Sequence, residues 1–135
     1  MVRDPSRPRP LVLVVEDDAD TREMLRLCLQ YSGIQATAAA NGHDALKKVT
    51  ETPPHAILLD IGLPDIDGYD LCRLLRDRPD THWTPIVALT GYAHPTDIQR
   101  AREAGCNAVL IKPCLPQHLL LQLQRLLPSH FRAIA

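Results

Sequence analysis

Five short apolar runs, separated by longer segments with helical spacing, constrain what this chain can fold into more than any other feature. The apolar runs predict strands over residues 11–15, 34–39, 56–60, 85–89 and 107–111. The intervening segments place apolar residues three and four positions apart and predict helices over residues 19–31, 43–51, 67–77, 95–104 and 116–127. Regular alternation of strand and helix is typical of an α/β protein, in which helices cover both faces of a parallel sheet.

The connections in such a protein restrict the order of its strands. Each strand–helix–strand crossover is right-handed in nearly all proteins. Five strands fit the doubly wound order 2-1-3-4-5, which is the flavodoxin-like (βα)5 arrangement. Ligands of open α/β sheets bind beyond the carboxyl ends of the strands, at the switch that this order places between strands 1 and 3. Functional side chains are therefore expected at those strand ends.

Length and charge exclude several broad classes of protein. With 135 residues, 45% of them apolar, the chain is long enough for one domain, expected over 11–127 between a flexible tail at 1–10 and a C-terminal tail at 128–135. A formal net charge of −1 gives no overall attraction to nucleic acid or to an anionic membrane. No apolar run approaches the roughly 18 residues that cross a bilayer, and residues 1–10 lack the apolar stretch of a secretory signal. A cytoplasmic protein without nucleic-acid or membrane partners is expected.

The cysteines and histidines show no spacing that indicates a metal or redox centre. The four cysteines are spread widely along the chain, at Cys28, Cys72, Cys106 and Cys114. Because there is no Cys-x-x-Cys pair and no paired Cys–His spacing, neither a zinc site nor a redox motif is indicated. The cysteines are interpreted as small apolar residues, with Cys114 the one expected to be partly exposed. The six histidines are expected at the surface.

Reactive side chains stand where four of the predicted strands end. The third strand closes with Asp60, and the first, fourth and fifth strands are followed by Glu16-Asp17, Thr90 and Lys112. A carboxylate at the end of a buried strand is typical of a functional site, because burying a charge without a use or a partner is costly. Any one of these residues alone would be a weak signal.

Taken in order, these residues resemble the pocket of the receiver domain of two-component response regulators. The resemblance also includes the turn Leu63-Pro64-Asp65-Ile66-Asp67-Gly68 and the pair Lys112-Pro113, whose bond is expected to be cis, and it covers about residues 11–127. It implies that Asp60 accepts a phosphoryl group from a histidine kinase or a histidine phosphotransfer protein. Phosphorylation would then change a protein-binding face formed by the fourth helix, the fifth strand and the fifth helix. The implied protein is a signalling domain, not an enzyme, and catalyses only its own phosphorylation and dephosphorylation.

The charges of this pocket require a metal ion. Carboxylates a few ångströms apart repel each other by roughly 4 kcal/mol per pair at an effective dielectric constant of about 20, and one lysine does not neutralise three of them. A divalent cation balances the charge, and oxygen ligands beside a phosphoryl substrate favour Mg²⁺. The resemblance implies that Thr90 and Lys112 contact the transferred group. It implies that the metal ligands are Glu16, Asp17, Asp60 and the backbone carbonyl of Gly62.

Each of these residues has a plainer structural interpretation when it is taken alone. Asp17 or Asp18 would cap the first helix, Thr90 is a common type of strand residue, and Lys112 would be a solvated surface amine. Asp67 is itself expected to cap the third helix rather than to bind metal. The joint spacing of all the residues favours the functional interpretation.

Two positions depart from the family pattern. Receivers commonly carry an aromatic residue three positions before the lysine, and this residue moves with the switch threonine. Here that position is Val109, and the residue after Lys-Pro, commonly Phe, is Cys114. Tyr92, two residues after Thr90, is an aromatic that could take part instead. The departure keeps an alternative open, namely a receiver-like module that binds its partner constitutively, without control by phosphorylation.

A phosphatase with an aspartyl-phosphate intermediate is a further alternative. Enzymes of the haloacid dehalogenase type place Asp-x-Asp after their first strand, whereas Asp60 follows the third strand and Gly62 stands where the second acid would be. This pattern disfavours the phosphatase. A stand-alone receiver and a receiver excised from a larger protein, such as a hybrid kinase, both agree with the sequence.

Overall fold

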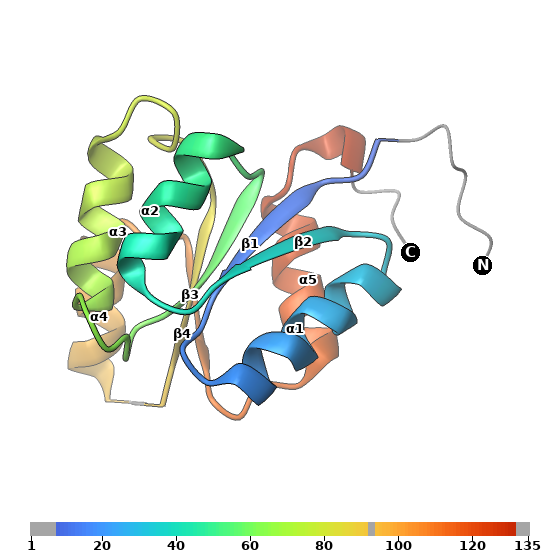
Figure 1. The fold of residues 1–135 in the computed structure, drawn as a ribbon. Coiled ribbons are helices and arrows are strands. Elements are labelled where there is room, and N and C mark those ends of the chain that lie inside the picture. The colour runs from blue at the N-terminus through green and yellow to red at the C-terminus, as the bar shows by residue number, and fades with distance from the viewer. Residues whose placement is uncertain (1–7, 92–93, 132–135) are drawn as a thin grey trace.

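The computed structural model describes residues 8–91 and 94–131 and confirms the doubly wound α/β fold (Figure 1). The strands are β1 (Leu11–Val15), β2 (Gln35–Ala39), β3 (Ala56–Asp60), β4 (Ile86–Thr90) and β5 (Ala108–Ile111). The helices are α1 (Ala19–Tyr31), α2 (Gly42–Glu51), α3 (Gly68–Asp77), α4 (Pro95–Glu103) and α5 (Pro116–Leu126). All strands pair in parallel, in the predicted order β2-β1-β3-β4-β5.

The central strands are apolar along their whole length because helices cover both of their faces. Every residue of β3 and β4 is buried, and so is β1 after its first residue. Figure 1 shows α2, α3 and α4 on one face of the sheet and α1 and α5 on the other. Alternate residues face opposite layers, so that Leu13 and Leu59 join the first layer while Val14 and Leu58 join the second.

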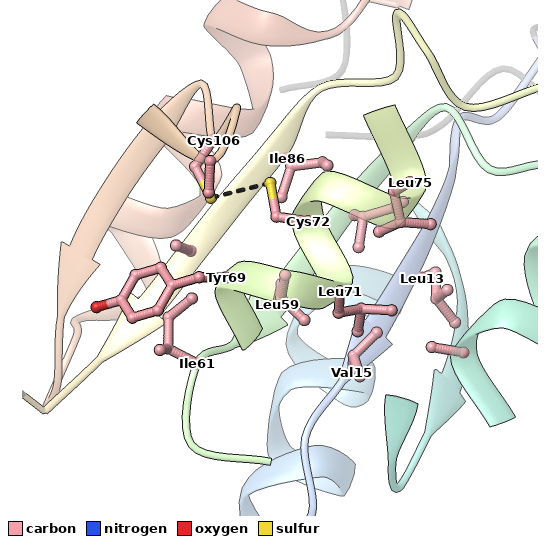
Figure 2. Packing of buried hydrophobic residues seen from close by; sticks show 14 of the residues in the cluster. Leu13, Val15, Leu59, Ile61, Tyr69, Leu71, Cys72, Leu75, Ile86 and Cys106 are labelled. Atoms are coloured by element: carbon pink, nitrogen blue, oxygen red, sulfur yellow. Dashed lines mark hydrogen bonds between the residues drawn. The ribbon is translucent and has the colours of Figure 1, made fainter. Parts of the chain in front are cut away.

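Packing of α3 against the sheet fixes the helix that follows the predicted phosphoacceptor. Leu71, Cys72 and Leu75 lie on its inner face, among the other core residues in Figure 2. Each of the three is at most 1% exposed. Full burial of one leucine side chain stabilises the fold by roughly 1.5–3 kcal/mol. At the start of the helix, the Asp67 carboxylate accepts a hydrogen bond from the Tyr69 amide at 2.8 Å. Asp67 therefore caps α3, as expected.

The observed elements lie within one residue of the predicted bounds, with two differences that matter. Thr90 is the last residue of β4 instead of following it, because it pairs with Ile111 and its carbonyl accepts a hydrogen bond from the Lys112 amide at 2.7 Å. The C-terminal residues were expected to be a tail from 128 onward. Residues Ser129–Phe131 instead form a short 3-10 helix, in which Phe131 is 4% exposed because its ring packs against the core and the His55 ring.

Two expectations remain, one on the exposure of the histidines and one on membrane-spanning helices. The histidines whose exposure is described all lie there, namely His43, His55, His82, His94 and His118. Within the described ranges, no helix combines the length and the apolar character needed to cross a membrane.

Gly68 lies where the chain after β3 passes closest to the start of α3. Its amide donates a hydrogen bond to the Ile61 carbonyl at 3.1 Å. A Cβ atom added at Gly68 would lie 2.5 Å from Ile61 Cα and 2.7 Å from that carbonyl oxygen. Because both neighbours are backbone atoms, the loop that leads away from Asp60 would have to shift to admit any side chain.

Gly68→Ala should therefore lower the free energy of unfolding by about 1–3 kcal/mol, the usual cost of forcing extra volume into a packed region. Urea unfolding followed by circular dichroism measures the change. Gly91→Ala is the matched control, since a Cβ there meets no atom of the described residues within 4 Å. Equal stability of the two variants would contradict the close approach of the two segments.

Candidate functional site

The carboxyl ends of β1, β3, β4 and β5 bring the predicted site residues to one edge of the sheet. The parallel register pairs Val15 with Leu59, Asp60 with Leu89, and Thr90 with Ile111, so that adjacent strands end nearly level. The side chains of Glu16, Asp60 and Thr90 at this edge are buried. The exposed fractions are 1% for Glu16, 6% for Asp60 and 2% for Thr90.

Lys112 bridges the two buried carboxylates. Its Nζ atom lies 2.8 Å from Glu16 Oε1 and 3.3 Å from Asp60 Oδ1. The bond between Lys112 and Pro113 is cis, as the family resemblance implied. Buried carboxylates are tolerated only when a counter-charge or hydrogen bonds compensate for the lost hydration, and Lys112 provides that charge.

The two carboxyl groups differ in their affinity for protons. Burial, together with the neighbouring Asp60 carboxyl, raises the pKa of Glu16 to about 7, although Lys112 acts in the opposite direction. Burial also acts to raise the pKa of Asp60. The Glu16 carboxyl, the Gly62 amide 3.1 Å from Asp60 Oδ1 and the Lys112 charge outweigh it and bring that pKa below its ordinary value. Asp60 is consequently an ionised carboxylate at neutral pH and has the charge state of a nucleophile.

Lys112 keeps its charge in this setting. Burial acts to lower the pKa of Lys112, but its contacts with Glu16 and Asp60 prevail and raise it. The pocket therefore contains one positive charge, on Lys112, and more than one carboxyl group. This arrangement can attract a cation and can also hold part of an anionic group beside the ammonium.

The acidic cluster has the donor atoms of a hard-metal site. Glu16, Asp17 and Asp60 each offer a carboxylate oxygen, and these oxygens lie within 4.8 Å of one another. Oε2 of Glu16 is buried and has no hydrogen-bond partner among the described residues. An unsatisfied buried oxygen is costly, and a cation would satisfy it. Asp17 is exposed, so that it borders the cluster on the solvent side.

Gly62 and Asp18, which lie beside the acidic cluster, both make local hydrogen bonds. The Gly62 amide is bound to Asp60, and the role of the Gly62 carbonyl as a metal ligand stays a prediction. Asp18 caps α1, because its carboxylate accepts a hydrogen bond from the Thr21 amide at 2.9 Å. The capping role that Asp17 or Asp18 might have taken thus falls to Asp18, and Asp17 is left beside Glu16 and Asp60.

Sequence reasoning missed Arg22, which supports the acidic loop from α1. Its Nη1 atom donates hydrogen bonds to the backbone carbonyl of Glu16 at 2.9 Å and to that of Asp17 at 3.2 Å. These bonds hold the backbone that presents the two carboxylates. An arginine on the first turns of an exposed helix carries no sequence signal for this role, because surface arginines are common on such helices.

Asp65 is a second residue whose role was missed. Its carboxylate accepts hydrogen bonds from the amides of Gly42 at 2.8 Å and His43 at 3.0 Å, and it also pairs with the His43 ring. These bonds, the Gly42 amide foremost, hold the pKa of Asp65 well below its usual range. The loop after Asp60 is thereby attached to the start of α2 through Asp65 and to α3 through Asp67.

The first of the two positions that depart from the family pattern packs inside the fold. Val109 is partly buried in β5 and contacts the core layer beneath α2, α3 and α4. Tyr92, the aromatic residue suggested as its substitute, lies outside the described residues. The expectation that Tyr92 acts as the moving aromatic stays a prediction.

Comparison with known proteins agrees with this geometry. The family model described as the response regulator receiver domain matches residues 12–124. The DNA-binding response regulator MtrA of Mycobacterium tuberculosis is 37% identical over 112 residues, which are 83% of this chain and 48% of MtrA. This chain therefore spans about half the length of that relative.

Solved structures show the same similarity. The chemotaxis response regulator CheY4 of Vibrio cholerae has a TM-score of 0.85 and 32% identity, over 89% of this chain and 100% of that one. The receiver domain of the sensor histidine kinase PA1611 from Pseudomonas aeruginosa, solved with a magnesium ion in its active site cleft, has a TM-score of 0.81 and 32% identity, over 88% of this chain and 98% of that one. Together with the family match over most of its length, these likenesses show that the chain belongs to the response regulator receiver domain family.

Proposed function

We propose that this receiver domain accepts a phosphoryl group on Asp60 from the phosphohistidine of a histidine kinase or a histidine phosphotransfer protein, with Mg²⁺ as cofactor. The observation that carries the proposal is the state of Asp60. It is an ionised carboxylate at the end of β3, deeply placed and 3.3 Å from the Lys112 ammonium. A nucleophile and a counter-charge for the arriving phosphoryl group therefore stand side by side.

In the proposed transfer, an Asp60 oxygen attacks the phosphorus atom while the bond from phosphorus to the donor histidine nitrogen breaks. The electron pair of that bond stays on the imidazole, and the product is an acyl phosphate on Asp60. Phosphoryl transfer depends mainly on alignment and on neutralising charge at the three equatorial oxygens. Lys112 would stabilise one oxygen with its ammonium, and the Thr90 hydroxyl at the end of β4 would donate to another.

The acidic cluster would hold the metal. Glu16, Asp17, Asp60 and the Gly62 carbonyl are the proposed ligands. Mg²⁺, when bound, supplies positive charge that balances the carboxylates and the phosphoryl oxygens. The buried, unpartnered Oε2 atom of Glu16 supports this assignment because it is an acceptor without a donor among the described residues.

The output of the proposed switch is the face formed by α4, β5 and α5. A route from the Asp60 loop to α4 exists that does not involve Val109. The Arg100 guanidinium of α4 stacks 4.3 Å from the ring centroid of Tyr69 and lies 3.8 Å from the Asp67 carboxylate. Because Tyr69 and Asp67 belong to the segment that follows Asp60, displacement of that segment would act directly on α4.

This route weakens the reason for a constitutive module, which was the missing aromatic at Val109. The downstream target is proposed to be a protein. DNA binding is not transferred from MtrA, because this chain corresponds to only 48% of that protein. The cytoplasmic location expected from the sequence stays a prediction.

The first prediction from the proposed function is that only Asp60 is phosphorylated. After incubation with acetyl phosphate and Mg²⁺, the intact mass should increase by one phosphoryl group in the unmodified protein and not in Asp60→Asn. Asp70→Asn, which removes an exposed carboxylate on α3, should be labelled like the unmodified protein. Equal labelling of Asp60→Asn would refute the assignment.

The second prediction concerns Mg²⁺ affinity and its dependence on pH. Because the raised pKa of Glu16, about 7, lets that carboxyl keep its proton in mildly acidic solution, Mg²⁺ must displace the proton below pH 7. The affinity should fall by up to about tenfold per pH unit there and level off above pH 8.

Calorimetry on Asp17→Asn should show several-fold weaker binding, whereas Asp20→Asn, on the first turn of α1, should bind normally. Undiminished affinity in Asp17→Asn would remove Asp17 from the ligand set.

The third prediction tests Lys112 as the counter-charge. Lys112→Met keeps most of the side chain but leaves the Glu16 and Asp60 carboxyls without their cation, which should lower the free energy of unfolding by about 1–3 kcal/mol in the absence of metal. Urea unfolding at pH 8 measures the loss, and Lys47→Met, at an exposed position of α2, is the control. A change no larger than that of the control would show that the ion pair contributes nothing to the fold.

A further inference from the structure

Cys72 and Cys106 meet in the core although they are 34 positions apart in the sequence. Their Sγ atoms lie 3.4 Å apart, and both residues are free thiols (Figure 2). Cys72 belongs to the inner face of α3, and Cys106 lies between α4 and β5. The exposed fractions of the two residues are 0% and 7%.

Hydrogen bonds from α3 hold the segment that carries Cys106 in place. Arg76 follows Cys72 by one helical turn, and its Nε atom donates to the Gly105 carbonyl at 2.9 Å. Its Nη2 atom donates to Asn107 Oδ1 at 2.6 Å. Because these bonds are made to the residues on both sides of Cys106, they hold the Cys106 backbone in place opposite Cys72.

We propose that Cys72 and Cys106 are a modification site, at which a two-electron oxidant such as a peroxide forms a reversible disulfide that joins α3 to the segment between α4 and β5. A disulfide has an S–S distance of about 2.05 Å. The sulfur atoms, 3.4 Å apart, would therefore have to approach by about 1.4 Å for the bond to form.

The reaction balances with hydrogen peroxide as the oxidant. The thiolate of one cysteine attacks a peroxide oxygen, the O–O bond breaks, and the hydroxide that leaves takes up the first thiol's proton to become water. The resulting sulfenic acid is attacked at sulfur by the second thiolate. The S–O bond then breaks, and the leaving hydroxide becomes a second water with the proton of the second thiol. The two sulfurs supply the two electrons that reduce the peroxide.

The local chemistry favours one thiolate. The hydrogen bond with Cys106 lowers the pKa of Cys72, against the effect of burial, and the charges of Arg76 and Arg73 act in the same direction. The same hydrogen bond raises the pKa of Cys106. Because the thiolate is the reactive form and both sulfurs are nearly enclosed, the reaction should proceed through local opening of the segment around Cys106 and be slower than at an exposed thiol.

The other two cysteines provide the controls. Cys114 packs against the opposite core layer, beneath α1 and α5, and Cys28 belongs to α1, so the sheet separates both from the pair. Both are partly exposed, and burial raises the pKa of each thiol. Replacing them removes competing reactions without touching Cys72 or Cys106.

The test uses the double variant Cys28→Ala/Cys114→Ala, oxidised with hydrogen peroxide while folded, as checked by circular dichroism. The intact mass should fall by two hydrogen atoms, return after dithiothreitol, and yield a peptide that links residues 72 and 106. A matched variant that also carries Cys72→Ala should lose no hydrogen and should gain only oxygen. Non-reducing electrophoresis should show a monomer in both cases.

A different result would overturn the proposal. Oxidation that adds oxygen to the paired protein without the loss of two hydrogens would show that the sulfurs do not join. A disulfide between two molecules would show that the linkage is not the one seen in the fold. Since the site does not depend on phosphorylation of Asp60, either result would leave the proposed function unaffected.

Discussion

The pairing of Lys112 with the buried carboxylates of Glu16 and Asp60 is the interaction on which the rest of the site depends. Taking a charge out of water costs several kcal/mol, so that none of these groups would be stable at the end of an enclosed strand by itself. The parallel sheet solves this problem by geometry. Adjacent strands end at the same edge, and the charges meet at 2.8 and 3.3 Å without any long flexible loop.

The charges and hydrogen bonds of this pocket do not fully offset the cost of burying its carboxylates. Glu16 keeps one buried oxygen without a donor among the described residues, and burial, together with the neighbouring Asp60 carboxyl, raises its pKa. An unsatisfied buried acceptor of this kind is typical of functional sites, where a ligand can supply the missing partner. Around this pocket the fold is firmly connected: Arg22 holds the acidic loop, Asp65 holds the loop after β3, and Arg100 joins that loop to α4.

The sequence was sufficient for the sheet and for the strand-end residues, because both depend on local patterns. Apolar runs identify strands, and a parallel sheet necessarily aligns their ends. Contacts made by long side chains across the fold could not be predicted, because their partners are backbone atoms or residues far along the chain. The bond from Arg76 to the Gly105 carbonyl is of this kind. The pairing of Cys72 with Cys106 was hidden from the sequence because the two residues are 34 positions apart. Phe131 shows the same effect, since its burial depends on contacts with the core and with the His55 ring that only the folded chain brings together.

The most direct test of the account is the structure of the protein with Mg²⁺ and beryllofluoride, a stable mimic of the phosphoryl group. The account predicts beryllium bonded to an Asp60 oxygen, with fluorine atoms in contact with Lys112 Nζ and the Thr90 hydroxyl. The metal should bind the carboxylates of Glu16, Asp17 and Asp60 and the carbonyl of Gly62. Beryllofluoride on another carboxylate, or Lys112 still bound to Glu16 with no contact to fluorine, would contradict the claim that Asp60 and Lys112 form the acceptor site.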